Sequence, residues 1–144
     1  MGSLLGSWQF WALMAACFAA LTAIFAKIGV DGVHPDFATF IRTVVVVVVL
    51  AGILAAFGGW QPLETVSART WLFLVLSGLA TGASWLCYFR ALKLGDAARV
   101  APLDKLSVVL VAVMGVFLLG EKLSATHWLG VGLVAGGAVL LAIR

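Results

Sequence analysis

Apolar residues run through this chain in five long segments, which short polar or glycine-rich breaks separate. We expect these segments at residues 8–29, 37–57, 71–92, 100–119 and 125–143. A helix needs about 20 mostly apolar residues to cross the hydrocarbon core of a bilayer, and only the last segment falls slightly short. The sequence therefore predicts an all-α, polytopic membrane protein with five transmembrane helices, which fill a single transmembrane domain over residues 1–144.

The second segment contains a run of valines at residues 44–49, which in water would favour a β-strand. In lipid, an isolated strand would leave its backbone N–H and C=O groups without hydrogen bonds, so we expect a helix here. Pro35 precedes this helix, as is typical of a helix start. Ser124 is a candidate N-cap for the last helix. Residues 1–5 lack the basic start of a signal peptide, so we expect the first segment to remain as a span.

The composition agrees with a lipid environment, because 64% of the residues are hydrophobic and 10% are charged, against about 25% charged in soluble domains. The net charge of +3 comes from Lys and Arg near helix ends, which indicates orientation and snorkelling rather than nucleic-acid binding. Cys17 and Cys87 lie in apolar runs, and His34 and His127 lie at turns. No catalytic motif or metal-ligand spacing is present, so we expect no enzyme, no cofactor and no metal.

Five spans place the two termini on opposite sides of the membrane. The side of the C-terminus carries the larger group of basic residues, namely Lys27, Arg90, Lys93, Arg99 and Arg144. The other side carries Arg69 and Lys122. By the positive-inside rule, this bias favours a cytoplasmic C-terminus.

Three charged residues lie more than one helical turn from the ends of the expected spans, where each needs a physical reason. Arg42 lies five residues into the second segment, and Asp104 and Lys105 lie at a similar depth in the fourth. An Arg42–Asp104 pair is therefore geometrically possible, and Lys27 ends the first segment on the same side. In one interpretation these groups line a substrate vestibule that favours anions. In the other, Lys27 and Lys105 snorkel to headgroups and Arg42–Asp104 is a structural clamp.

The third segment combines hydroxyl and aromatic residues on one helical face, because Ser77, Thr81, Trp85 and Tyr88 follow helical spacing. Trp85 lies well inside the span, so this face either lines a cavity for a small amphipathic solute or packs against another helix. Pairs of glycines four residues apart favour close helix contact. They are Gly78 with Gly82 and Gly132 with Gly136.

Several stretches together resemble the EamA domain of the drug/metabolite transporter superfamily. They are residues 88–102 (YFRALKLGDAARVAP), 119–124 (LGEKLS), 128–130 (WLG), Gly136-Gly137 and 40–42 (FIR). Members typically have ten helices in two inverted five-helix repeats around a central cavity. This chain resembles one such repeat. The smaller four-helix relatives depend on an acidic residue in their first helix, and residues 8–30 contain none.

The resemblance implies a secondary transporter of small metabolites or drugs, an exporter, in the bacterial inner membrane. From the charges inside the spans and the polar face of the third segment, we expect the substrate path at Arg42, Thr81, Trp85, Tyr88, Asp104 and Lys105. A single repeat implies a partner, which is a second copy in inverted or, slightly less favoured, parallel orientation, or another half-length protein. The alternative is a scaffold or accessory subunit that transports nothing.

Overall fold

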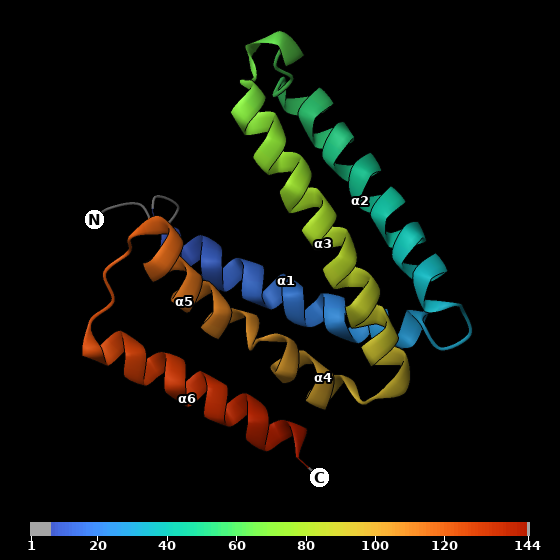
Figure 1. Ribbon diagram of the computed structural model, residues 1–144. Helices are drawn as coiled ribbons and strands as arrows, with labels where there is room; N and C mark the ends of the chain where they lie inside the picture. The colour runs from blue at the N-terminus through green and yellow to red at the C-terminus, as the bar shows by residue number, and fades with distance from the viewer. Residues whose placement is uncertain (1–6, 144) are drawn as a thin grey trace. The chain divides into compact units, whose positions relative to one another are not determined.

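The computed structural model describes residues 7–143, and all of the regular secondary structure in this range is helical (Figure 1). Its elements are α1 (Trp8–Gly29), α2 (Pro35–Phe57), the 3-10 turn η2 (Leu63–Thr65), α3 (Ala68–Leu94), α4 (Ala97–Asp104), α5 (Ser107–Leu119) and α6 (Ala125–Ala142). Five stretches are long and apolar enough to cross a membrane, and one of them, Ala97–Leu119, combines α4 and α5. The prediction of an all-α membrane protein with five spans is confirmed. Two predictions concern residues that lie outside the described range. Residues 1–5 enter the prediction about a signal peptide, and Arg144 enters the prediction about orientation.

The chain divides into two compact units, which are described separately here. One unit is the continuous segment Ile28–Lys93, in which α2 and α3 run antiparallel and η2 lies in the connection between them (Figure 1). The other unit comprises the chain up to Lys27 and from Leu94 onward. In this second unit α6 packs along both α4 and α5.

The helix ends follow local rules that the sequence makes visible. The side chain of His34 caps α2 by accepting a hydrogen bond from the Asp36 amide, and a proline occupies the first turn. Ser124 caps α6, as predicted, in a capping box whose second member is His127. At their C-terminal ends, α2 and α5 stop at Gly58 and Gly120, with φ angles of 67° and 69°. Glycine adopts this left-handed conformation without the steric cost of a side chain.

The fourth predicted span is not one continuous helix, because α4 ends at Asp104 and α5 begins at Ser107. Pro102 has no N–H to donate to the carbonyl of Ala98, and its ring crowds that carbonyl. In the turns that follow, the amides of Leu106 and Val108 donate three residues back, to Leu103 and Lys105. A tight 3-10 connection therefore interrupts the span directly after Asp104.

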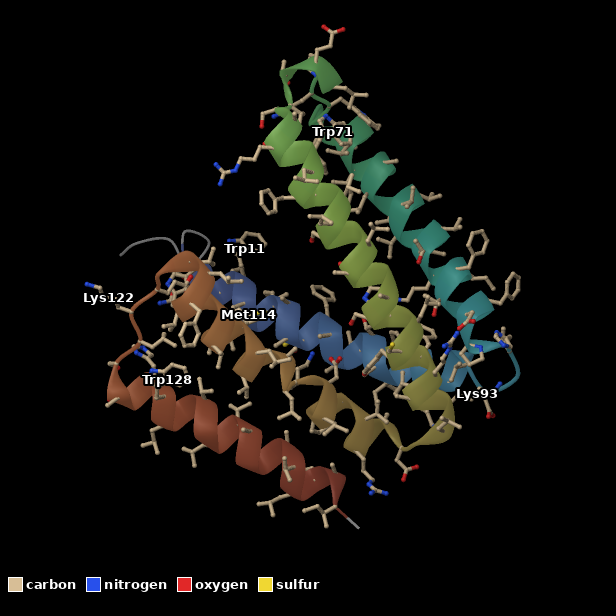
Figure 2. All side chains as sticks on the ribbon, in the orientation of Figure 1. Trp11, Trp71, Lys93, Met114, Lys122 and Trp128 are labelled. Atoms are coloured by element: carbon tan, nitrogen blue, oxygen red, sulfur yellow. The ribbon has the colours of Figure 1, made fainter. Side chains whose placement is uncertain are left out.

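Most large apolar side chains of the spans point outward from the protein. Phe117 of α5 is 80% exposed and Leu140 of α6 is 73% exposed. Trp11 lies near the start of α1 and Trp71 near the start of α3, as an interfacial belt requires (Figure 2). Lipid is the solvent that suits such a surface, since water would be ordered around it at a large free-energy cost.

Candidate functional site

Arg42 and Trp85 come together between α2 and α3. The guanidinium carbon of Arg42 lies 3.8 Å from the centre of the Trp85 ring and 5.8 Å from that of Phe89. The two aromatic residues are four positions apart on α3, so their rings follow one another along one helix face. The planar cation lies against the electron-rich face of the indole, which stabilises a charge inside the span. Within residues 7–143, the guanidinium of Arg42 makes no ion pair.

The other two predicted site residues of α3 lie one turn away from Trp85. Thr81 is exposed, and its hydroxyl donates a hydrogen bond of 2.8 Å to the carbonyl of Ser77 in its own helix. Tyr88 is half-buried and lies on the side of Trp85 toward the end of α3. Trp85 is half-buried as well. Arg42 of the neighbouring helix thus meets this stretch of α3 at Trp85, and the assignment of the face to a substrate path stays a prediction.

Asp104 and Lys105 lie at the interruption of the fourth span. The Lys105 ammonium is 3.4 Å from an Asp104 carboxylate oxygen, with side-chain exposures of 55% and 37%. In a regular helix the side chains of two successive residues point about 100° apart, which keeps their charged groups separated. Asp104 and Lys105 pair where α4 ends and this regular spacing is lost. Asp104 and Arg42 belong to different units, and their pairing stays a prediction.

The four glycines that the sequence assigns to helix packing are open. A side-chain carbon added at Gly78, Gly82, Gly132 or Gly136 would meet nothing within 4 Å. These stretches of α3 and α6 are therefore free to receive the backbone of a further helix at short distance.

The sequence interpretation missed a clamp at the end of α3. Arg90 donates from Nε and Nη2 to the two carboxylate oxygens of Asp36, at 3.0 and 2.8 Å. Lys93, one turn further on, donates to the carbonyl of Val33 at 2.7 Å. Figure 2 shows Lys93 at the end of α3 that lies opposite Trp71. Two basic side chains of α3 thus hold the first turn of α2 and the turn that precedes it.

Two further basic residues bind backbone carbonyls at turns of the other unit. Lys27 donates to Gly95 O at 2.9 Å, and Arg99 donates to Ala142 O at 2.7 Å. The sequence gives Arg90, Lys93 and Arg99 a role in orientation only, and it also considers Lys27 for the vestibule. The sequence did contain a signal for the Arg90 clamp, because Asp36 lies in the first turn of α2 and the last turn of α3 is basic. Two antiparallel neighbouring helices bring these two turns together.

The arrangement at Arg42 suits recognition of an anion. A guanidinium that stacks through its face keeps its N–H groups at its edge, where they match the two oxygens of a carboxylate or phosphate. The indole fixes the plane of the guanidinium and so reduces the conformational entropy that binding would remove.

The chain has five apolar spans, of which the fourth is interrupted, and it holds a cation against an aromatic side chain inside the membrane. These features are those of a polytopic membrane transporter. The EamA-like transporter family matches residues 6–143, and the chain belongs to this family. The resemblance seen in the sequence is confirmed.

Curated relatives agree with this assignment. A Sinorhizobium protein named "Uncharacterized transporter in cobO 3'region" is 68% identical over 95% of this chain and 97% of its own length. The Bacillus subtilis "Uncharacterized transporter YxxF" is 27% identical over 98% of this chain, which spans only 44% of that relative. A Proteus mirabilis protein named "Probable 4-amino-4-deoxy-L-arabinose-phosphoundecaprenol flippase subunit ArnE" is 26% identical over 59% of this chain and 76% of its own length. No solved structure matches the chain.

Proposed function

We propose that this protein is a secondary transporter that exports small metabolites or drugs carrying an anionic group. The observation that carries the proposal is the stacking of Arg42 on Trp85 inside the α2–α3 hairpin. A charged residue within a span is costly and marks a substrate or ion path by default. Thr81 and Tyr88 extend the same face, and Asp104 and Lys105 supply polar groups at the interrupted fourth span.

The names of the relatives support this class of substrate. The Proteus mirabilis relative is named as a flippase subunit for a lipid-linked sugar that carries a phosphate. A phosphate or carboxylate is the partner that an Arg edge recognises with two parallel hydrogen bonds.

We further propose that the functional unit is a dimer of single transmembrane domains in the bacterial inner membrane, with the C-terminus in the cytoplasm. The chain spans less than half of the Bacillus subtilis relative, and the Proteus mirabilis relative is named as a subunit. An inverted homodimer would reproduce the symmetry of inverted repeats, whereas the Lys and Arg bias opposes equal insertion in both directions. The open glycines of α3 and α6 offer faces for such pairing.

The orientation experiment uses a C-terminal tag whose accessibility is measured from each side of sealed vesicles. Two populations of comparable size support the inverted homodimer. A single population excludes it and leaves a parallel dimer or a different half-length partner. Gly82→Leu and Gly136→Leu variants, compared by cross-linking yield, then show which helix face forms the contact.

A second candidate function is that of an accessory subunit that transports nothing by itself. The word "subunit" in the name of the Proteus mirabilis relative favours it. Flux measurements on liposomes that contain only this protein distinguish the two functions. Candidate anionic solutes are first selected by the increase in melting temperature that binding to the folded state produces. Flux that requires Arg42 supports the transporter, whereas absent flux together with a co-purifying membrane protein supports the accessory subunit.

A further inference from the structure

Asp104 is the only acidic residue that lies more than one helical turn from the ends of the described spans. Four of the six acidic residues in the chain lie outside these spans, namely Asp31, Glu64, Asp96 and Glu121. Asp36 lies in the first turn of α2, where Arg90 binds both of its carboxylate oxygens. Asp104 belongs to the span Ala97–Leu119, about 10 Å from its start along the axis of a regular helix. A carboxylate at this depth is costly, and such residues mark substrate or ion paths.

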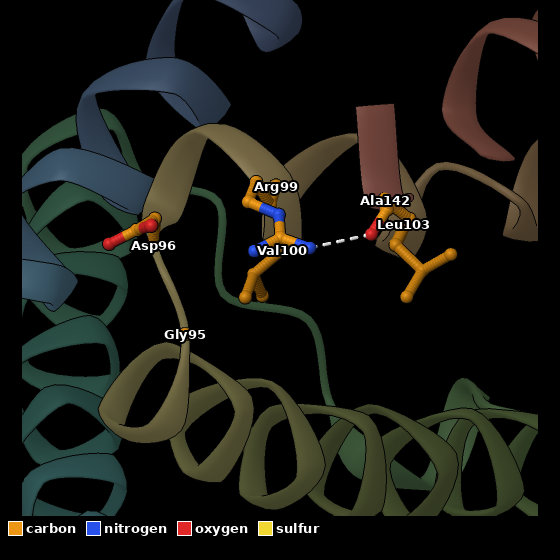
Figure 3. A pocket seen from close by; sticks show the side chains of 6 residues that line it. All are labelled: Gly95, Asp96, Arg99, Val100, Leu103 and Ala142. Atoms are coloured by element: carbon orange, nitrogen blue, oxygen red, sulfur yellow. Dashed lines mark hydrogen bonds between the residues drawn. The ribbon is translucent and has the colours of Figure 1, made fainter. Parts of the chain in front are cut away.

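The charge of this carboxylate is balanced by the next residue in the chain. The Lys105 ammonium lies 3.4 Å from an Asp104 carboxylate oxygen, and Asp104 makes no other ion pair in the part of the chain that the structure describes. α5 has no titratable side chain, and α6, which packs along α4, has only His127 in its first turn. Arg99, the other charged residue of α4, donates to Ala142 O at the end of α6 (Figure 3). Lys105 is therefore the counter-ion of Asp104.

The ion pair lies where the fourth span is interrupted. α4 ends at Asp104, and the amide of Leu106 donates three residues back to the carbonyl of Leu103. Transporters typically bind substrates and coupling ions at discontinuous helices of this kind. Both charged side chains are partly exposed, so the Lys105 ammonium can move away from Asp104 without breaking a packed core. The position suits a group that changes its charge during transport.

We propose that Asp104 binds a proton that moves together with the transported anion, and that this proton releases Lys105. The inference rests on the proposed transport function. When a proton binds to a carboxylate oxygen, Asp104 becomes a neutral acid and Lys105 keeps its positive charge without a partner. The released ammonium then attracts the anionic group of a substrate. When the substrate leaves, the proton dissociates and the Asp104–Lys105 pair forms again.

The sign of the coupling follows from this exchange. The proton and the anion each stabilise the form of the protein that the other prefers, and such linkage is reciprocal. They therefore bind together and do not compete. A monoanion then crosses the membrane with one proton as an electrically neutral pair, on which the membrane potential does no net work. Export in this mode is driven by the concentration gradient of the metabolite itself.

Proton binding is tested on the full-length protein in liposomes without any transported substrate. Infrared difference spectra, recorded as the pH is lowered from about 8 to about 4, show a carboxyl stretching band for each carboxylate that takes up a proton. Asp104→Asn should remove one component of this band, and Asp104→Glu, which keeps a carboxyl group, should retain one. Lys105→Gln should extend the Asp104 component to higher pH, because an opposite charge no longer favours the carboxylate. A purely structural role of Lys105 would leave the component where it is.

Asp96→Asn is the matched control, because Asp96 lies before α4, makes no capping hydrogen bond and points away from Arg99 (Figure 3). It should keep the component that Asp104→Asn removes. A band that Asp104→Asn leaves unchanged would overturn the proposal.

The coupling is then measured with whichever solute raises the melting temperature most among inorganic phosphate, short carboxylates and sugar phosphates. A pH-sensitive dye inside the liposomes records proton movement during flux. We expect one proton for each monoanion, no effect of an imposed membrane potential, and an apparent KM that falls by up to about tenfold for each unit that the pH is lowered. In Asp104→Asn, flux should carry no protons and the pH dependence of KM should disappear. Flux without proton movement in the unaltered protein would overturn the proposal. Absence of flux for every solute would count against the transport function, while the infrared band still decides whether Asp104 binds a proton.

Discussion

The guanidinium carbon of Arg42 lies over the indole of Trp85, 3.8 Å from the ring centre, between two antiparallel helices of the same unit. Neither residue needs the rest of the transporter for this contact, so the pair is already formed in the hairpin. A cation placed in this way is stabilised by the ring and keeps its hydrogen-bonding edge available. Under the proposed function, we expect substrate recognition at this position to depend on the planarity of the cation as well as on its charge.

Arg42→Lys should consequently weaken transport although it conserves the charge. An ammonium offers no planar edge to a carboxylate or phosphate. The loss of a stacking interaction worth about 0.5–2 kcal/mol corresponds to a decrease in apparent substrate affinity of roughly 2- to 30-fold. Trp85→Leu should produce a decrease of similar size, whereas Trp71→Leu, near the start of the same helix, should leave the affinity unchanged. Apparent KM values for flux into liposomes make the comparison, and unaltered affinity in Arg42→Lys would contradict this role.

The bidentate contact between Arg90 and Asp36 should act as a clamp on the turn that precedes α2. Arg90→Gln and Asp36→Asn should each lower the melting temperature slightly, because both side chains are partly exposed and exposed ion pairs contribute little. The melting temperature of the double variant should be no lower than that of the less stable single variant. High salt should reduce the loss that each change causes. Arg69→Gln provides the control for loss of one positive charge. Additive losses in the double variant would show that the two residues act separately.

The sequence predicts the spans well because membrane insertion depends on local hydropathy. The start of α2 at Pro35 and the cap at Ser124 follow from short-range rules as well. The interruption of the fourth span was not predicted, although Pro102, which lies just before it, is visible in the sequence. Proline is tolerated within membrane helices when neighbouring groups satisfy the backbone, so its presence alone does not decide between a kink and a break.

The contacts of the basic residues were the other part that the sequence did not reveal. Positive charges at span ends satisfy the orientation rule whether or not they bind a carbonyl. Lys27 and Arg99 reach carbonyls that lie 68 and 43 positions away in the chain. Such partners depend on which helix ends become neighbours, and hydropathy carries no information on that point. The Arg42–Trp85 contact was hidden for the same reason, although both residues were selected individually.

Pro102→Ala tests whether the interruption of the fourth span serves transport. Alanine restores an N–H that can donate to Ala98 O, and it removes a residue that is unfavourable in a helix interior by about 3 kcal/mol. We expect the melting temperature to rise and the amides near Lys105 to exchange more slowly, while flux falls. Pro62→Ala, in the connection before η2, serves as the control. Full flux in a stabilised Pro102→Ala protein would show that the interruption is not required.

The end of α5 offers a test of local backbone strain. Gly120→Ala should destabilise the protein by about 1 kcal/mol, because its φ of 69° is unfavourable for a residue with a side chain. At Gly115, an added carbon would lie 2.7 Å from a carboxylate oxygen of Glu121. Because this oxygen ends a flexible, exposed side chain that can move aside, Gly115→Ala should change the stability little, in the unaltered protein as well as together with Glu121→Ala. Urea or thermal unfolding measures both effects, and a large loss of stability in the unaltered protein that Glu121→Ala removes would show that the Glu121 side chain is fixed.

The exchange of Arg42 and Asp104 distinguishes a structural clamp from a substrate site. If the two residues serve only to pair with each other, Arg42→Asp combined with Asp104→Arg should restore both folding and flux after either single change has impaired them. If Arg42 binds an anionic group of the substrate, the exchange should restore folding and leave flux absent. We expect the second result. An aspartate at position 42 would direct its carboxylate toward the negative face of Trp85, which repels anions and removes the platform on which the substrate site depends. Flux like that of the unaltered protein in Arg42→Ala would show that neither role is correct.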